Sequence, residues 1–295
     1  MKALVLAETS DAARALCAGA RQYADAVVFA AIGDSEVPNG IADEVVRIAL
    51  PEGVVYDDAA DTVISYCDTV APDLVFCEPT RRLKTIAGKL ASHAHTAVVT
   101  DVIAFDGDVA RSLYFGGIGQ RTLKARNLMV CTVAPSHFAE RQASGANASV
   151  EFAWVAPRVP LVRVSSEPIE KTGVDLTKAD VVVAAGRGFT SEAELDLARK
   201  LCDKLDAGFG CTRPLTEGVD LLPRELYIGV TGLTVTPKVY LACGISGQMQ
   251  HMVGCNRSGT IFAINKDANA AVFKQCDYGL VGDVATVLPA LVAAL

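Results

Sequence analysis

The chain has 295 residues, 51% of them hydrophobic and 21% charged, which is enough for one large or two ordinary domains with substantial cores. Its formal net charge is −7, from 27 basic and 34 acidic residues, so it lacks the basic field with which nucleic-acid binders neutralise phosphates. No apolar run approaches the roughly 20 residues of a membrane span, and the N-terminus resembles neither a signal nor a transit peptide, which predicts a cytoplasmic protein without membrane insertion.

The first hundred residues alternate between strand-like and helix-like patterns. Such alternation predicts a parallel sheet with helices on its faces, and burial on both faces explains the continuous apolar runs. We expect strands at residues 2–7, 26–32, 44–49 and 74–78, and helices at residues 12–24, 59–70 and 81–93.

The pattern changes after residue 97, where short β-rich runs follow one another. They are punctuated by Gly116-Gly117 and Ala156-Pro157. We expect these runs to add strands to the first sheet. The runs are residues 97–103, 111–115, 128–133, 150–155 and 161–164.

A polar connector at residues 167–178 separates two predicted domains, 1–166 and 179–295. The predicted fold class is α/β. An N-terminal parallel-sheet α/β domain with extra β-strands is followed by a Rossmann-like, doubly wound domain.

The second domain opens with a strand at residues 181–185 and then a helix. Ser191 and Glu194 form a capping-box pattern at the start of that helix. On its solvent side, Asp196 and Lys200 are spaced as an i,i+4 ion pair.

The nine cysteines are odd in number and contain no pair with CxxC spacing. This argues against a disulfide framework, a zinc site and a ferredoxin-type cluster. We expect reduced thiols, mostly small buried side chains, and no metal.

Two loops of the second domain follow apolar strand-like segments, beyond which ligands bind in parallel sheets. Residues 186–191 offer Arg187 and free amides to an anion at a helix N-terminus, although a tight turn with an exposed arginine explains them equally well. In Thr212-Arg213-Pro214 the proline restricts Arg213 to an extended backbone, where its guanidinium can lie against an aromatic ring. An ordinary surface turn is the simpler interpretation of that loop alone.

A third loop, residues 228–232, carries Gly229 and Gly232, and such glycines allow a flat ligand to approach the backbone. A hairpin bend explains this loop equally well. The strongest candidate is residues 244–251, where a strand runs into two glycines. Here Ser246 and the following amides can cradle a pyrophosphate.

Four further polar residues follow this turn. Gln250 and His251 stand within one helical turn of it. Asn265 ends the next strand, where a strand-ending turn is the simpler reading, and Asp283 is either the N-cap of the last helix or an acceptor for a ribose hydroxyl.

Six segments of the second domain together resemble the alpha subunit of electron transfer flavoproteins in order and spacing. The resemblance is strong over roughly the last 120 residues and weaker in the N-terminal domain, where Phe115-Gly116-Gly117 and Thr132-Val133 carry it. The six segments are GRG at 186–188, TRP at 212–214, TG at 231–232 with Pro237, GISGQMQH at 244–251, INKD at 264–267 and DYG at 277–279.

The resemblance implies one bound FAD. Arg187, Thr212 and Ser246 would hold its pyrophosphate. Arg213 would lie by the isoalloxazine ring and Thr231 would donate to N5, while Gln250 and a protonated His251 would reach the pyrimidine edge. Asn265 and Asp283 would hold the adenosine end, and Val230 stands where many members carry Gln. The implied contact residues are Arg187, Thr212, Arg213, Ile228, Gly229, Val230, Thr231, Ser246, Gly247, Gln248, Met249, Gln250, His251, Asn265, Asp283 and Val284.

The resemblance also implies a heterodimer with a beta subunit, which the N-terminal domain would contact. Such a pair shuttles electrons from flavoprotein dehydrogenases, such as the acyl-CoA dehydrogenases of fatty acid beta-oxidation, to a downstream acceptor. It is an electron carrier rather than a classical enzyme.

Two alternatives stay open. One is the alpha subunit of an electron-bifurcating, NADH-oxidising flavoprotein complex, which a second flavin instead of AMP in the partner chain would distinguish. The other is a non-redox nucleotide-binding regulatory protein, which would show no flavin absorbance.

Overall fold

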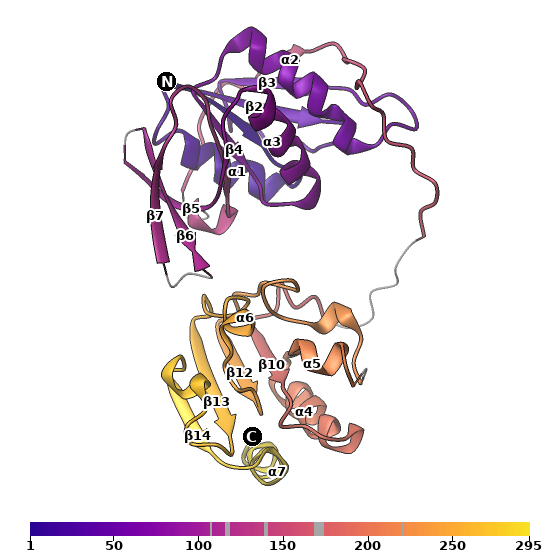
Figure 1. Cartoon of the computed structure of the whole chain (residues 1–295), viewed down its shortest axis with the longest axis vertical. Helices are drawn as coiled ribbons and strands as arrows, with labels where there is room; N and C mark the ends of the chain where they lie inside the picture. Colours follow the sequence, from indigo (N-terminus) through magenta and orange to yellow (C-terminus); the bar gives the residue numbers. More distant parts are fainter. Residues whose placement is uncertain (107, 116–118, 139–140, 168–173, 220) are drawn as a thin grey trace. The chain divides into compact units, whose positions relative to one another are not determined.

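The computed structural model describes residues 1–295 except 107, 116–118, 139–140, 168–173 and 220. It divides into two compact units, Met1–Glu167 and Pro168–Leu295 (Figure 1). Residues 168–173, half of the predicted linker at 167–178, lie outside the described residues, so the linker stays a prediction, as do the bounds 1–166 and 179–295. Gly116-Gly117 also lies outside them.

The first unit is built on a nine-stranded sheet in the order β7-β6-β5-β8-β4-β1-β2-β3-β9. Neighbours from β5 to β9 in this order are parallel, whereas β6 is antiparallel to β5 and β7. Helix α1 packs on one face, and α2 and α3 pack on the other. The elements are β1 (Lys2–Leu6), α1 (Ser10–Ala20), β2 (Ala26–Ile32), β3 (Glu44–Ile48), α2 (Ala60–Val70), β4 (Leu74–Cys77), α3 (Arg81–His93), β5 (Val98–Asp106), β6 (Val109–Tyr114), β7 (Gly119–Lys124), β8 (Met129–Val133) and β9 (Ala148–Glu151).

The α/β fold class is confirmed, and β2 and α3 begin and end where the sequence predicts. Two features differ. The strand predicted at 161–164 is wrong, because this segment pairs with no strand and the Leu161 N–H instead donates to the Asp58 carboxylate at 3.0 Å. Strand β7 was not predicted, because its sequence GQRTLK is mostly polar and its residues are half-buried or exposed.

The second unit is built on a five-stranded, wholly parallel sheet in the order β11-β10-β12-β13-β14. The chain moves outward from β10 to β11 and then returns to add β12 on the other side, so the sheet is doubly wound and changes direction between β10 and β12. The elements are β10 (Val181–Ala185), α4 (Glu192–Leu205), β11 (Gly208–Cys211), α5 (Arg213–Thr216), β12 (Val239–Cys243), α6 (Met249–Met252), β13 (Thr260–Asn265), β14 (Tyr278–Val281) and α7 (Val284–Ala294).

Helices α4 and α7 pack on one face of this sheet (Figure 1). The other face is covered by apolar side chains from the segments around it, among them Leu176, Ile228, Met252 and Val272. The two faces together bury β10 and β12, which therefore hold the loops that follow them in fixed positions.

The start of α4 confirms the expected cap but differs in its partners. Ser191 accepts a hydrogen bond from the Glu194 N–H at 3.3 Å, whereas the Glu194 carboxylate accepts from the Thr190 N–H rather than from Ser191. The predicted Asp196–Lys200 pair is wrong. Arg199 takes that place, because its guanidinium reaches Asp196 at 2.6 Å and also Glu192.

All nine cysteines are free thiols, as predicted. Eight are buried, and only Cys276 is half-buried. Burial raises the pKa of Cys211, Cys243 and Cys255 to about 12, so these thiols are protonated at neutral pH.

The loops after β10 and β12 approach each other closely at glycines of both loops. The Gly188 N–H donates to the Gly244 carbonyl at 2.9 Å, and a Cβ on Gly188 would lie 2.6 Å from the Gly244 Cα. Gly244 has a φ of +61°, which disfavours any other residue. The switch point of the sheet therefore requires glycine on both sides.

We expect Gly188→Ala to lower the free energy of unfolding by about 1–3 kcal/mol, because the added methyl group forces two backbones apart. Gly88→Ala is the matched control, since no atom outside its own helix lies within 4 Å of the added Cβ. In the interior of α3 that change should stabilise the protein by about 0.5–1 kcal/mol. Chemical denaturation checks both values, and equal effects of the two substitutions would contradict the tight-contact explanation.

Candidate functional site

A cleft of about 560 Å³ lies at the carboxyl ends of the second sheet. This volume is within the range of about 300–1,000 Å³ found for cofactor and small-molecule sites. The ends of all five strands contribute to its wall. The lining residues are Arg187, Gly188, Thr212, Arg213, Pro214, Tyr227, Val230, Gly244, Ile245, Ser246, Gln248, Gln250, His251, Asn265, Lys266, Asp283 and Val284.

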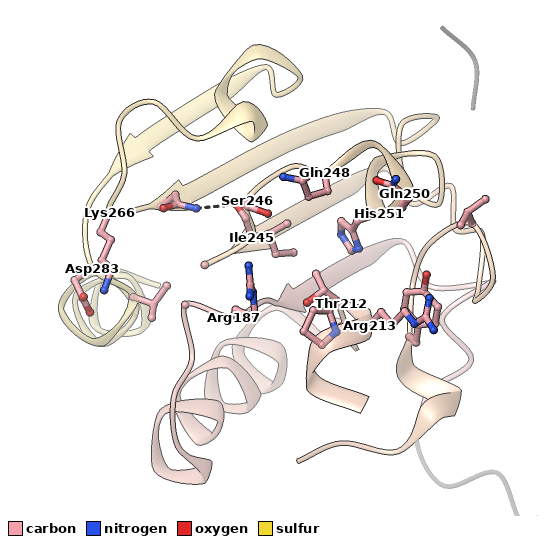
Figure 2. A pocket seen from close by; sticks show the side chains of 17 residues that line it. Arg187, Thr212, Arg213, Ile245, Ser246, Gln248, Gln250, His251, Lys266 and Asp283 are labelled. Carbon is pink, nitrogen blue, oxygen red and sulfur yellow. Dashed lines mark hydrogen bonds between the residues drawn. The ribbon is translucent and has the colours of Figure 1, made fainter. Parts of the chain in front are cut away.

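The cleft is elongated, and its polar groups are spread along it. Figure 2 shows Asp283 and Lys266 at one end and Arg213 towards the other, with Arg187 and Ser246 between them. An extended ligand lying in it therefore meets a different set of groups at each end.

Donors without a protein acceptor lie around the turn at 244–247 and at the end of the cleft beside it (Figure 2). Within the described parts of the chain, the N–H groups of Ser246 and Gly247 make no hydrogen bond to the protein, and Arg187 and Lys266 form no ion pair. Asn265 braces this turn, because its side-chain amide donates to the Ile245 carbonyl at 2.8 Å. Free amides beside two cations are the donor set that binds a phosphate group.

Arg213 lies on α5, with its side chain 59% exposed. The prediction of an extended backbone is wrong, because Arg213 is the first residue of this short helix, with Thr212 as the preceding N-cap. Its Nε donates to Glu217 one turn later at 2.6 Å, and Glu217 is also 3.6 Å from Arg224. The guanidinium is therefore held at the mouth of the cleft by a carboxylate shared between two arginines.

His251 is buried at the floor of the cleft, and both of its ring nitrogens are engaged. Nδ1 lies 2.9 Å from the Ile228 carbonyl oxygen, which only accepts, so Nδ1 carries the proton. Nε2 then accepts from the Tyr240 hydroxyl at 2.9 Å.

Burial lowers the pKa of His251 to about 4, although the bond to Ile228 acts in the opposite direction. The prediction of a protonated His251 is therefore wrong in this structure. The imidazole is neutral because neither ring nitrogen faces a negative charge.

Five residues of the predicted set do not line the cleft: Ile228, Gly229, Thr231, Gly247 and Met249. Close approach of a ligand to Gly229 and Gly232 stays a prediction, and the structure gives these glycines a separate reason. A Cβ on Gly229 would lie 2.6 Å from the Gln250 carbonyl oxygen, and one on Gly232 would lie 2.5 Å from the Tyr227 ring. These glycines make room for the protein's own groups.

Other wall residues were absent from the predicted set, namely Gly188, Pro214, Tyr227, Gly244, Ile245 and Lys266. All except Tyr227 belong to the motifs that predicted the site, so including whole motifs would have found them. Tyr227 precedes the loop at 228–232 and carries no motif of its own.

Two classes of site find no support in the described residues. No group of three or more His, Cys, Asp or Glu side chains there is arranged to hold a metal ion. No helix in the same parts of the chain has the length and apolar character needed to cross a membrane.

The burial of His251 predicts a pH-dependent loss of stability. Its pKa is about 4 when folded and 6.5 when unfolded, so the unfolded chain binds more protons between these values. The contribution to the free energy of unfolding is complete above about pH 6.5 and falls by about 3 kcal/mol as the pH drops to 4. His251→Gln should lack this component in denaturation curves measured from pH 7 to pH 4. A His251 imidazole signal that titrates near pH 6.5 in NMR spectra would contradict the assignment.

Comparison with known proteins identifies the family. The family model of the electron transfer flavoprotein domain matches residues 3–157, and that of the electron transfer flavoprotein FAD-binding domain matches residues 175–256. Protein FixB of Escherichia coli O127:H6 (strain E2348/69 / EPEC) is 36% identical over 307 residues, covering 99% of this chain and 97% of FixB. FixB of Shigella dysenteriae serotype 1 (strain Sd197) has the same identity and coverage, and FixB of Escherichia coli O81 (strain ED1a) is 41% identical over 76% of this chain and 74% of its own length. The chain therefore belongs to the electron transfer flavoprotein alpha family, as an electron-transfer subunit whose second domain binds FAD.

Proposed function

We propose that FAD lies along the cleft described above, and that the chain is the FAD-carrying half of a two-chain electron shuttle. One observation carries the proposal: the ends of five parallel strands form an elongated cleft with the amides of the turn at 244–247 and the Arg187 cation between its two ends (Figure 2). The chemistry of the wall fits the cofactor. The apolar Tyr227, Val230 and Pro214 suit a flat ring, and the donors around Ser246 suit a pyrophosphate.

The proposed contacts follow the order of groups along the cleft. Arg187, Thr212 and Ser246 bind the pyrophosphate, the last with the amides of its turn. Asp283 and Asn265 bind the adenosine end, beside Lys266 (Figure 2).

The ring end is assigned to the opposite part of the cleft. Arg213 lies by the isoalloxazine, Gln250 and His251 reach its pyrimidine edge, and Thr231 donates to N5. Thr231 lies beside the cleft rather than on its wall, where its hydroxyl is 3.5 Å from that of Tyr227, so this contact requires its side chain to turn towards the cleft.

Bound FAD supplies a ring that accepts and releases electrons, and the protein supplies its binding and its electrostatic surroundings. Reduction adds negative charge to the ring, and a fixed cation nearby stabilises that charge. Arg213 is the proposed cation. His251 contributes no charge, because it is neutral, and serves as an uncharged wall.

We further propose a heterodimer with a beta subunit contacted by the N-terminal unit, and electron donors that are flavoprotein dehydrogenases, such as acyl-CoA dehydrogenases of fatty acid beta-oxidation. The proposed compartment is the cytoplasm. Nine unpaired cysteines support a reducing environment.

The proposal is tested by co-expression with the neighbouring chain and flavin counting. We expect a yellow heterodimer with one FAD in this subunit and AMP in the partner. Two flavins per pair with NADH oxidation would favour electron bifurcation instead, and a colourless heterodimer after reconstitution with FAD would refute the proposed function.

Arg187→Gln tests the pyrophosphate assignment. Loss of a charge-assisted hydrogen bond costs about 1.5–3 kcal/mol, so FAD should dissociate about 10- to 150-fold more readily. Arg257→Gln is the matched control, because Arg257 is equally exposed and lies outside the cleft. Isothermal titration with FAD measures both, and the same dissociation constant for the two variants would contradict the assignment.

A further inference from the structure

A buried chain of hydrogen bonds runs beneath the cleft. It joins Tyr240 on β12, His251 on α6 and Ile228 in the loop after α5. The Tyr240 side chain is fully buried and is the largest such side chain in the described residues. Its hydroxyl lies 2.9 Å from His251 Nε2 and also forms a hydrogen bond with the Cys255 thiol.

The hydrogen-bond partners of a neutral His251 allow one tautomer. The Ile228 carbonyl only accepts, so His251 donates to it through Nδ1–H and presents Nε2 as an acceptor. Tyr240 fills that acceptor with its O–H. The Tyr240 ring is fixed by its packing in the core, so its O–H holds the orientation of the imidazole, whose tautomer the Ile228 carbonyl already determines.

The groups that surround this chain are neutral. The thiols of Cys211, Cys243 and Cys255 act on Tyr240, and all three are protonated. Among the described residues no charged side chain shifts the pKa of His251, which is set by burial and by the Ile228 carbonyl. The arrangement therefore persists at neutral pH whatever the charge of the cleft above it.

The imidazole clamps the loop at 228–231 against α6. His251 holds the Ile228 carbonyl at 2.9 Å, and the adjacent Gln250 carbonyl accepts from the Val230 N–H at 2.8 Å. The two bonds attach one side of the loop to the helix that follows the glycine-rich turn. Val230, whose side chain is 63% exposed at the cleft, is positioned by them.

We propose that Tyr240 is a positioning residue of the FAD site: by donating to Nε2 of the neutral His251, it holds in place the imidazole that attaches the loop at 228–231 to α6. Tyr240 never touches the cofactor and acts only through His251. This role rests on the proposed function of the cleft, but the hydrogen-bond chain itself belongs to the protein without FAD.

Tyr240→Phe removes one hydroxyl and leaves the ring. In the full chain without FAD, ¹⁵N NMR of the imidazole should show one tautomer in the wild type, with Nε2 unprotonated and accepting a hydrogen bond. In the variant, Nε2 should lose the signature of an accepted hydrogen bond, and the pKa of His251 should rise towards its ordinary value, because the neutral form loses its donor. In the heterodimer, the dissociation constant for FAD should rise about five- to tenfold, the value of one hydrogen bond.

Tyr66→Phe is the matched control. Tyr66 is also buried, and its hydroxyl donates to Glu44 at 2.7 Å in the first unit. Loss of the Tyr66 hydroxyl should lower the free energy of unfolding by a similar amount, while the His251 spectrum and the FAD affinity stay as in the wild type. Equal changes in both variants would reduce the role of Tyr240 to general stability and overturn the proposal.

The wild type alone provides a second measurement if Tyr240→Phe does not fold. Addition of FAD to the heterodimer should leave the His251 tautomer unchanged. A proton appearing on Nε2, or a broken bond to Tyr240, would overturn the positioning role even though FAD binds. Failure of the wild type to bind FAD would instead refute the proposed function, and the positioning role with it.

Discussion

The constraint on which the second unit depends is that all five strands of its sheet run in one direction. Parallel strands place their carboxyl ends at one edge, and the change of winding between β10 and β12 leaves a crevice there that no helix fills. Loops from distant parts of the sequence meet at this crevice. They approach so closely that Gly188 and Gly244 touch backbone to backbone.

The architecture could be predicted from the sequence because parallel strands buried on both faces leave a strong pattern. Residues 26–32 and 181–185 are continuous apolar runs with no other stable explanation. Strand β7 could not be predicted because it has no such pattern. It is the antiparallel edge strand of the sheet, and its mostly polar side chains face water, so its sequence does not alternate between apolar and polar residues. The error at residues 161–164 is the reverse: apolar residues there predict a strand, but the segment pairs with no strand.

The position of the candidate site could be predicted from the sequence, but the protonation state of His251 within it could not. Motif order gave most of the wall, from Arg187 to Asp283, because each motif follows a strand and the strand ends converge. The charge of His251 depends on what lies beneath it. Nothing in the stretch 244–251 reveals that Tyr240, on the strand that leads into the turn and eleven residues before His251, supplies a hydrogen bond to the neutral ring.

In this site, buried uncharged residues set the geometry, and exposed cations can tune the charge. Groups that set geometry, Tyr240 and His251, are buried and uncharged, so water and salt do not disturb them. Groups that can tune charge, Arg213 and Arg187, stay exposed at the cleft and are screened by solvent. Their influence on a ligand grows when water is excluded, because the same charge acts more strongly in a lower dielectric. Whatever covers the cleft, the ligand or a partner chain, therefore controls how strongly these cations act on the ring.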